Sequence, residues 1–217
     1  METLLFKGLK QEEIEVFLEY SGSIRKKYYE GQYIFEELQS PDYLFILLSG
    51  QVQVEKLDPS GKRMIVNKFN KKGTIFGEVY LYLDRHEYDY SCLATVDSEI
   101  LKIPKEALLI DDKASLISRR INENMLKILS EKAYFLNQKI LILGSSNLRE
   151  KISKFLLQRM DGDKKVILTI TREEMADFIG VTRPSLSREL MKMQKDNLIE
   201  VEKNIIYINT EEVYKYL

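Results

Sequence analysis

A stretch near the C-terminal end of the chain, residues 171–193, most constrains the possible fold. Thr171 and Glu174 are spaced as a capping box, in which each side chain can satisfy the other residue's backbone N–H, so a helix begins there. Gly180 lies where the chain must turn sharply, and glycine accepts a positive φ without steric cost. Thr182 can then cap a second helix. The stretch therefore predicts two short helices joined by a tight turn.

The second helix of this predicted pair has a polar face rich in arginine and hydroxyl groups. A helix can enter the major groove of DNA, which is about 12 Å wide, and present arginine to O6 and N7 of guanine. Hydroxyl groups and lysine can meet phosphates or base edges there. The predicted DNA-binding residues, including those at the two helix starts, are Thr171, Arg172, Thr182, Arg183, Ser185, Ser187, Arg188 and Lys192.

Charge is balanced over the whole chain but not within this region. The sequence has 33 Lys and Arg against 34 Asp and Glu, a net charge of -1, which argues neither for nor against nucleic acid. Between residues 145 and 195, eleven basic residues stand against seven acidic ones, a local excess of four. This local excess favours a DNA-binding face, and phosphate contacts would make its binding depend on salt.

The segments around the helix pair complete a familiar arrangement. Residues 198–208 read as a β-hairpin that turns at residues 202–204. A hairpin directly after the second helix is the wing of a winged helix. An amphipathic helix at residues 148–157 and a short strand at residues 166–170 are expected before the pair.

The N-terminal half of the chain has a different pattern. Residues 4–20 predict short helices, and residues 24–103 form short runs rich in Tyr, Ile, Val, Phe and Leu. Turn residues separate these runs at intervals of about ten residues, which is typical of an antiparallel sandwich or barrel. Residues 51–55 alternate polar with apolar side chains, so we expect one face of that strand to be buried and the other to face water.

Between the two halves the apolar period becomes helical. From residue 122 to residue 143, a mostly apolar row of residues recurs at intervals of four and three positions in turn, as in a coiled-coil seam. The predicted dimerisation residues on this heptad row are Leu126, Leu129, Ala133, Leu136 and Ile140. A second row runs beside it and consists of Ile121, Met125, Ile128, Phe135 and Ile142. One row can pack on its own domain while the other meets a second copy, and the spacing leaves open which row does which.

Several classes of protein are disfavoured by what the chain lacks. Cys92 and His86 are its only cysteine and histidine, so no Cys/His set for zinc and no catalytic triad can be assembled. Glu78 and Asp89 form no recognised catalytic set with His86 either. No run of about 18 apolar residues occurs, and the first residues do not resemble a leader. We therefore expect a cytoplasmic protein that is not an enzyme.

Taken together, these blocks resemble the Crp/Fnr family of bacterial transcription regulators. Residues 31–35, 41–54 and 73–78 are similar to the family's cyclic-nucleotide-binding β-roll, and residues 171–193 to its DNA-reading helices. The resemblance implies a homodimer that binds double-stranded DNA, with RNA polymerase as a possible partner. The family's recognition positions correspond to Arg183, Pro184, Ser187 and Arg188. Proline cannot accept a hydrogen bond from cytosine N4, so the family's known operator sequences do not carry over.

The resemblance also implies a fold class and a domain division. We expect an α+β chain with an antiparallel, cyclic-nucleotide-binding-like β-roll, a long dimerisation helix and a C-terminal winged helix-turn-helix. The effector-sensing roll with its N-terminal helices should span residues 1–110, the dimerisation helix residues 111–143 and the DNA-binding domain residues 144–217. Residues 144–147 break the helical pattern and offer a cap.

The effector cannot be identified from the resemblance. Members that bind cyclic AMP hold its phosphate with an arginine followed by serine or threonine, shortly after a Gly-Glu pair. Here the corresponding pocket residues are Gly77, Glu78, Tyr88, Asp89, Tyr90 and Ser91. None of these residues is an arginine, and Arg85 lies too early in the sequence to take the place of the phosphate-binding one. Because Asp89 would also repel a phosphate, cyclic AMP is disfavoured as the ligand. An unidentified small molecule, or no effector at all, remains open.

The same residues bear on other ways of sensing and on other classes of function. One cysteine cannot hold an iron–sulfur cluster, whereas haem would need an axial ligand from His86, Cys92, a methionine or a tyrosine. A cyclic-nucleotide-responsive module that binds protein instead of DNA is the alternative function. A β-barrel enzyme has little support. Operator sequence, target genes and the choice between activation and repression cannot be read from the chain.

Overall fold

Two compact units make up the chain, Met1–Ser130 and Glu131–Leu217. The computed structural model describes residues 3–58, 63–83, 85–109 and 116–217. The boundary between the units falls inside helix α4 (Leu116–Leu143), so the last turns of this helix belong to the C-terminal unit. The boundary expected at residues 110 and 111 lies outside the described residues, and the division into three parts stays a prediction.

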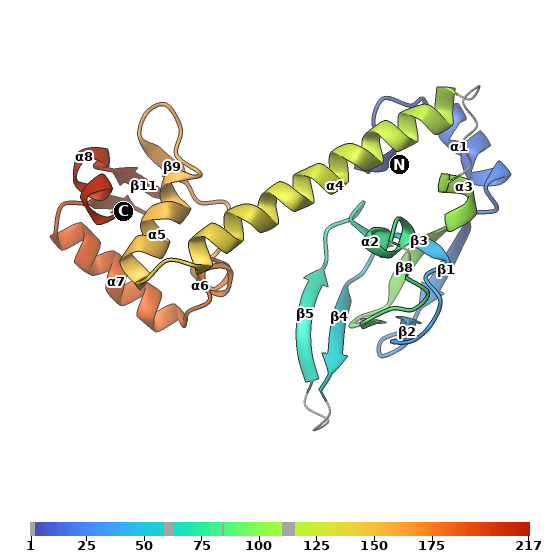
Figure 1. Cartoon of the computed structure of the whole chain (residues 1–217), viewed down its shortest axis with the longest axis horizontal. Helices are drawn as coiled ribbons and strands as arrows, with labels where there is room; N and C mark the ends of the chain where they lie inside the picture. Colours follow the sequence, from blue (N-terminus) through green and yellow to red (C-terminus); the bar gives the residue numbers. More distant parts are fainter. Residues whose placement is uncertain (1–2, 59–62, 84, 110–115) are drawn as a thin grey trace. The chain divides into compact units, whose positions relative to one another are not determined.

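Within the described residues, two four-stranded sheets form the N-terminal unit (Figure 1). The strands are β1 (Ile24–Tyr28), β2 (Tyr33–Phe35), β3 (Tyr43–Ser49), β4 (Val52–Leu57), β5 (Arg63–Phe69), β6 (Ile75–Phe76), β7 (Ser91–Ala94) and β8 (Ser98–Pro104). One sheet has the order β1-β8-β3-β6 and the other β2-β7-β4-β5, and the paired strands are antiparallel. The antiparallel strands expected from the turn spacing, and the β-roll implied by the family resemblance, are thus confirmed.

Strand β3 is buried on both faces and divides the unit's interior into two cores. Leu44 and Ile46 pack with the helices, whereas Phe45 and Leu47 face the interior of the roll. An uninterrupted apolar run is what a strand covered on both sides requires. The covering helices are η1 (Leu4–Phe6), α1 (Gln11–Tyr20), α3 (Lys105–Leu109) and the first half of α4.

Aromatic rings fill much of the interior of the roll. Phe35 stacks on Tyr88 with ring centroids 4.0 Å apart, and Phe45 stacks on Phe76 at 5.2 Å. Gly77 precedes the short helix α2 (Glu78–Leu81) with φ of 80°, the left-handed conformation that glycine tolerates. The space that a ligand would occupy in such a roll is therefore largely taken by the protein's own side chains.

Strand β4 departs from the alternation expected for it. The prediction that its polar face meets water is wrong, because Gln53 and Glu55 are 5% and 2% exposed. The Gln53 amide Nε2 donates to Glu55 Oε2 at 2.6 Å, and Arg63 Nε lies 3.4 Å from Glu55 Oε1. Buried polar groups are tolerated when they satisfy one another, and a period-two pattern does not reveal such pairing.

The first half of α4 is fastened to the N-terminal unit. Ile121, Met125 and Ile128 are buried in the core beneath the helices. The side-chain amide of Asn124 donates to the carbonyl oxygens of Leu5 and Lys7, both at 2.8 Å. No helix in the described ranges is both long enough and apolar enough to cross a membrane.

The C-terminal unit is a winged helix. Its elements are α5 (Leu148–Leu157), β9 (Lys165–Ile167), α6 (Arg172–Ile179), α7 (Arg183–Lys195), β10 (Ile199–Glu202), β11 (Ile205–Ile208), α8 (Thr210–Val213) and η2 (Tyr214–Tyr216). The sheet order is β10-β11-β9, and Met175, Leu186 and Met193 are buried between the helices and this sheet. The two helices and the hairpin predicted from the sequence are confirmed.

Candidate DNA interface and sensor region

Local caps set the ends of the two helices of the motif. Thr171 Oγ1 accepts a hydrogen bond from the Glu174 N–H at 3.1 Å, and Glu174 Oε2 accepts from the Thr171 N–H at 2.7 Å. Gly180 ends α6 with φ of 76°, and Thr182 Oγ1 accepts from the Ser185 N–H at 3.4 Å to begin α7. The turn between the helices is therefore specified by the residues within it.

A partly buried cluster of ion pairs, called the clamp below, holds α7 against the unit. Arg149, at the start of α5, places Nε 2.7 Å from Glu189 Oε1 and Nη1 2.8 Å from Asp196 Oδ2. Its guanidinium also lies over the ring of Tyr216. The hydrogen bond to Glu189 is the main cause of the raised pKa of Arg149. Sequence reasoning missed this clamp, because forty residues separate Arg149 from Glu189.

The polar face of α7 is open to solvent. Arg183 is 62% exposed, and Arg188 and Lys192 are exposed as well. Positions 183 and 187 are one helical turn apart, whereas position 188 does not face position 183 across the helix surface. Arg188 Nη2 lies 3.4 Å from Ser185 Oγ, which keeps the guanidinium beside the helix start. All three residues belong to α7, with both arginines exposed and Ser187 half-buried.

The remaining predicted DNA-binding residues have other roles within the unit. Thr171 and Thr182 use their hydroxyl oxygens as caps. Arg172 is half-buried, its Nη1 lies 3.8 Å from Met175 Sδ, and burial lowers the pKa of its guanidinium. With Ser187 it lines a small cavity of about 150 Å³ beside α7. Thr171, Thr182 and Arg172 therefore each make a contact that shapes the winged helix itself.

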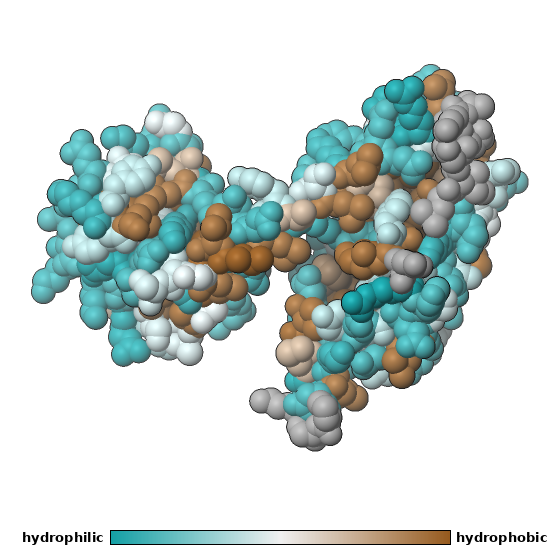
Figure 2. Space-filling model, in the orientation of Figure 1, coloured by the Kyte–Doolittle hydropathy of each residue, from teal (hydrophilic) through white to brown (hydrophobic). Residues whose placement is uncertain are grey.

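Helix α4 leaves one of its two apolar rows uncovered. Leu126, Leu136 and Ile140 on the heptad row are 67%, 56% and 65% exposed. Figure 2 shows hydrophobic side chains gathered over the C-terminal half of this helix. The second row is buried at Ile121, Met125, Ile128 and Ile142, whereas Phe135 packs against Phe178 on α6. The heptad row is therefore the more exposed of the two, although its Leu129 packs against the N-terminal core.

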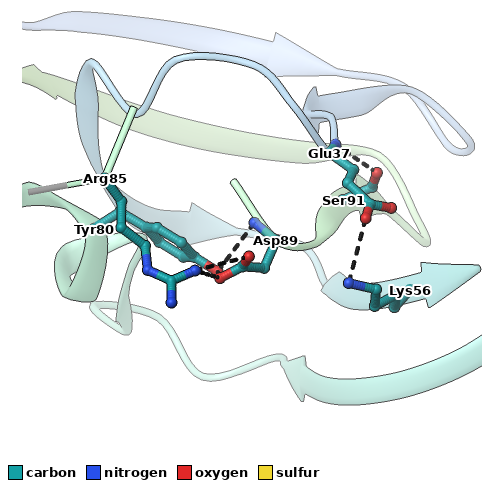
Figure 3. A network of polar contacts seen from close by, with 6 residues as sticks. All are labelled: Glu37, Lys56, Tyr80, Arg85, Asp89 and Ser91. Carbon is teal, nitrogen blue, oxygen red and sulfur yellow. Dashed lines mark hydrogen bonds and ion pairs between the residues drawn. The ribbon is translucent and has the colours of Figure 1, made fainter. Parts of the chain in front are cut away.

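In the sensor region, Asp89 is already engaged by its own chain. Arg85 Nη1 donates to both of its carboxylate oxygens, at 3.0 and 2.9 Å, and the Tyr80 hydroxyl donates to Oδ2 at 3.3 Å (Figure 3). Burial raises the pKa of Tyr80 to about 12, so this hydroxyl stays protonated. Arg85 and Asp89 thus form an exposed ion pair, so a phosphate bound by this guanidinium would have to compete with Asp89.

The other residues of the predicted pocket do not converge with Asp89. Ser91 Oγ accepts from the Glu37 N–H at 2.9 Å, and Glu37 pairs with Lys56 at 3.3 Å, in a separate group (Figure 3). The ammonium of Lys56 also lies over the ring of Tyr90. Tyr88 faces the aromatic interior, and a Cβ on Gly77 would lie 2.8 Å from the Phe45 ring.

Glu78 and Cys92 are both buried in the roll, 3% and 0% exposed. Burial is the main cause of the raised pKa of Cys92, which keeps its thiol protonated and unreactive. Among the residues that the structure describes, no group of three or more His, Cys, Asp or Glu side chains is placed to hold a metal ion.

Comparisons with known proteins agree with this architecture. Residues 25–110 match the cyclic nucleotide-binding domain, and residues 150–215 match the Crp-like helix-turn-helix domain. Electron transport regulator A of Shewanella oneidensis is 26% identical, with 87% of this chain and 76% of that protein covered. The anaerobic regulatory protein of Bacillus subtilis is 24% identical over 84% of this chain and 78% of its own length.

A solved structure extends the agreement to the fold. The c-di-GMP responsive global regulator CLP of Xanthomonas campestris has a TM-score of 0.56 and 21% identity, with 92% of this chain and 99% of that chain covered. The two family domains occur in the same order as the roll and the winged helix described above. The chain belongs to the Crp/Fnr family of DNA-binding transcription regulators.

Proposed function

We propose that this chain acts as a cytoplasmic homodimer that reads a specific DNA sequence with α7 and thereby controls transcription by RNA polymerase. The observation that carries the proposal is the exposure of Arg183 and Arg188, together with the half-buried Ser187, on a rigidly held helix. Arginine can donate two hydrogen bonds to guanine in the major groove. The clamp at Arg149 supports the proposal, because base readout requires a recognition helix with a fixed orientation.

Dimerisation supplies the spacing that such a readout needs. Two recognition helices related by a two-fold axis meet half-sites about 34 Å apart on one side of DNA. The heptad row of α4, with Leu126, Leu129, Ala133, Leu136 and Ile140, is the seam we propose between the two copies. Its exposed leucine and isoleucine side chains support this assignment, because a long apolar helix face is costly to leave in water.

The roll is proposed to sense a ligand other than cyclic AMP. Tyr88 and Asp89 stand where the phosphate-binding pair of cyclic-AMP-dependent relatives would be expected, and both are engaged by neighbouring residues. A phosphodiester placed beside Asp89 would lack a free cation and would meet a like charge. This argument also disfavours the alternative of a cyclic-nucleotide-responsive module that binds protein.

The DNA-binding proposal is tested with promoter fragments from the source genome, bound by the wild type and by Arg183→Ala/Arg188→Ala. Each bidentate arginine contributes about 1–3 kcal/mol of discrimination, so the double variant should lose specific affinity by about 100-fold or more. Arg25→Ala/Lys27→Ala, which removes two exposed basic residues of β1, is the matched control and should bind as the wild type does. Equal affinity and sequence preference in the wild type and the reading-face variant would show that α7 does not read DNA.

The dimer is tested by placing a carboxylate in the seam. Leu136→Glu should convert the dimer to monomer at micromolar concentration in light scattering, because an unpaired buried charge costs about 3–5 kcal/mol. Tyr134→Glu is the matched control, since Tyr134 is 67% exposed on the same helix but lies off the heptad row. If both variants keep the mass of the wild type, the seam does not run along the heptad row.

A further inference from the structure

A cavity of about 230 Å³ lies at one end of the roll, beside the loop between β2 and β3. Its walls combine aromatic rings with polar side chains. The aromatic residues are Phe35, Tyr43 and Phe45, and the polar ones are Gln39, Ser40, Asp42, Tyr88 and Lys102. Of these, Tyr88 alone belongs to the pocket predicted from the family resemblance, so the cavity is defined mainly by residues that the resemblance did not indicate.

The hydroxyl of Tyr88 lacks a hydrogen-bond partner within the described part of the chain. Tyr88 is only 2% exposed, so bulk solvent does not reach this group. Burial is the main cause of its raised pKa, and the carboxylate of Asp42 raises it further. The hydroxyl therefore stays protonated. A buried donor without an acceptor is rare in proteins and indicates that an acceptor is supplied from elsewhere.

The ammonium of Lys102 is a second donor at the cavity. It lies 3.9 Å above the ring of Tyr43, and no carboxylate of the described residues forms an ion pair with it. Burial lowers its pKa first, the nearby charge of Lys26 lowers it further, and Asp42 raises it. Lys102 is paired with Phe45 in the register of β3 and β8, so its side chain is directed to the interior side of the roll.

Asp42 provides the complementary negative charge. Its Oδ1 accepts a hydrogen bond from Ser40 Oγ at 2.5 Å, which holds the carboxylate at the cavity wall. Lys102, Asp42 and Tyr88 thus place one cation, one anion and one neutral donor beside the aromatic rings of the cavity. A ligand with only a carboxylate would be repelled by Asp42, and a ligand with only an amine would be repelled by Lys102.

We propose that this cavity binds a small zwitterion with an apolar side chain, of the class of the free α-amino acids. Its carboxylate would accept hydrogen bonds from Lys102 and from the Tyr88 hydroxyl, and its ammonium would contact Asp42. The rings of Phe35, Tyr43 and Phe45 would enclose the apolar side chain. This inference rests on the proposed function only in treating the ligand as the effector of a DNA-binding regulator.

The test is calorimetric titration of the full chain with L-leucine and L-phenylalanine. At least one of the two should bind saturably, with a dissociation constant below about 1 mM, and should raise the melting temperature by mass action. The analogues 4-methylpentanoate and 3-methylbutylamine, which each carry one of leucine's two charges, should bind at least tenfold more weakly than leucine. The absence of binding by both amino acids, or an equally tight single-charge analogue, would overturn the proposal.

Two variants tie the binding to the cavity. Tyr88→Phe removes only the unpartnered hydroxyl, so it should fold as the wild type does and should weaken binding at least tenfold. Lys102→Met should do the same, whereas Lys27→Met, an exposed lysine of β1, should leave the affinity unchanged. Wild-type affinity in both Tyr88→Phe and Lys102→Met would place the ligand elsewhere and contradict the proposal.

The two proposals fail separately. Titration without DNA tests the cavity alone, and DNA binding measured with and without the amino acid tests the reading helix. If the amino acid binds and the promoter fragment binds in neither condition, the DNA-binding proposal fails while the cavity stands. The reverse result retains the DNA-binding proposal and rejects the zwitterion.

Discussion

The roll and the winged helix keep different parts of the family pattern, and the contrast shows where this chain has specialised. In the winged helix, Arg183, Pro184 and Arg188 at the family's reading positions are exposed, and ion pairs to Arg149 hold their helix in place. In the roll, Tyr88 is buried against Phe35, and Asp89 is paired with Arg85. The basic residues of the reading helix are thus retained, whereas the arginine of the phosphate-binding pair is not.

Different interactions stabilise the inside of each region. The interior of the roll is a stack of aromatic rings, including Phe35, Phe45, Phe76 and Tyr88, which depends on close packing. The winged helix relies in addition on caps and ion pairs, among them Thr171 with Glu174 and Arg149 with Glu189. Packing should therefore control the stability of the roll, and charge should contribute more to that of the winged helix.

The largest effect is expected at Gly77 in the roll. In Gly77→Ala the new Cβ would lie 2.8 Å from the buried ring of Phe45 at a φ of 80°, so we expect destabilisation by about 3 kcal/mol. Gly31→Ala has a φ of 82° with nothing within 4 Å, and it should cost only about 1 kcal/mol. Thermal or denaturant unfolding measures both. Similar losses for the two variants would mean that the roll has room beside Phe45.

A smaller effect is expected from breaking the clamp of the winged helix. Arg149→Met removes charged hydrogen bonds to Glu189 and Asp196 from a side chain that is 19% exposed, and it should cost about 2 kcal/mol. Specific DNA affinity should fall while the exposed reading residues are unchanged. Lys151→Met, two residues further along α5, serves as the control. Wild-type stability and DNA affinity in Arg149→Met would contradict a positioning role for this residue.

The smallest expected effect is the loss of stability of the winged helix at low pH. Hydrogen bonds from Lys154 and Ser146 lower the pKa of Glu150 to about 2, and bonds from Thr171 lower that of Glu174. A carboxylate with a depressed pKa stabilises the folded state above its unfolded pKa, and this contribution is lost as pH falls through the folded value.

The winged helix should therefore open before the roll between about pH 4.5 and pH 2, as measured by hydrogen exchange of peptides from each unit. The variant Glu150→Gln/Glu174→Gln should reduce this difference between the units. A roll that opens first in acid would show that the assignment of charge-dependent stability is reversed.

The parts of the structure that could be predicted from sequence are those set by local chemistry. The capping box at Thr171, the left-handed turn at Gly180 and the hairpin after α7 each depend on residues a few positions apart. The turn spacing of the N-terminal half likewise indicated antiparallel strands. Such signals can be recognised in a sequence because the hydrogen bonds that they predict join residues only a few positions apart.

The remaining features depend on contacts between distant residues. Tyr88 is buried because Phe35 lies against it, and Gln53 and Glu55 are buried because they satisfy each other and Arg63. Heptad spacing identified two apolar rows on α4, but only packing against the N-terminal core distinguishes them. The DNA-binding, effector-pocket and dimerisation residues as functional sets stay predictions.

The most direct test of the account is selection of binding sites from a random library of duplex DNA by the purified full chain, followed by sequencing. A homodimer that reads DNA with α7 should enrich a two-fold symmetric motif whose half-sites are about one helical turn, roughly 34 Å, apart. The motif should disappear with Arg183→Ala/Arg188→Ala. Failure to enrich any motif, or the same motif from the double variant, would contradict the central claim.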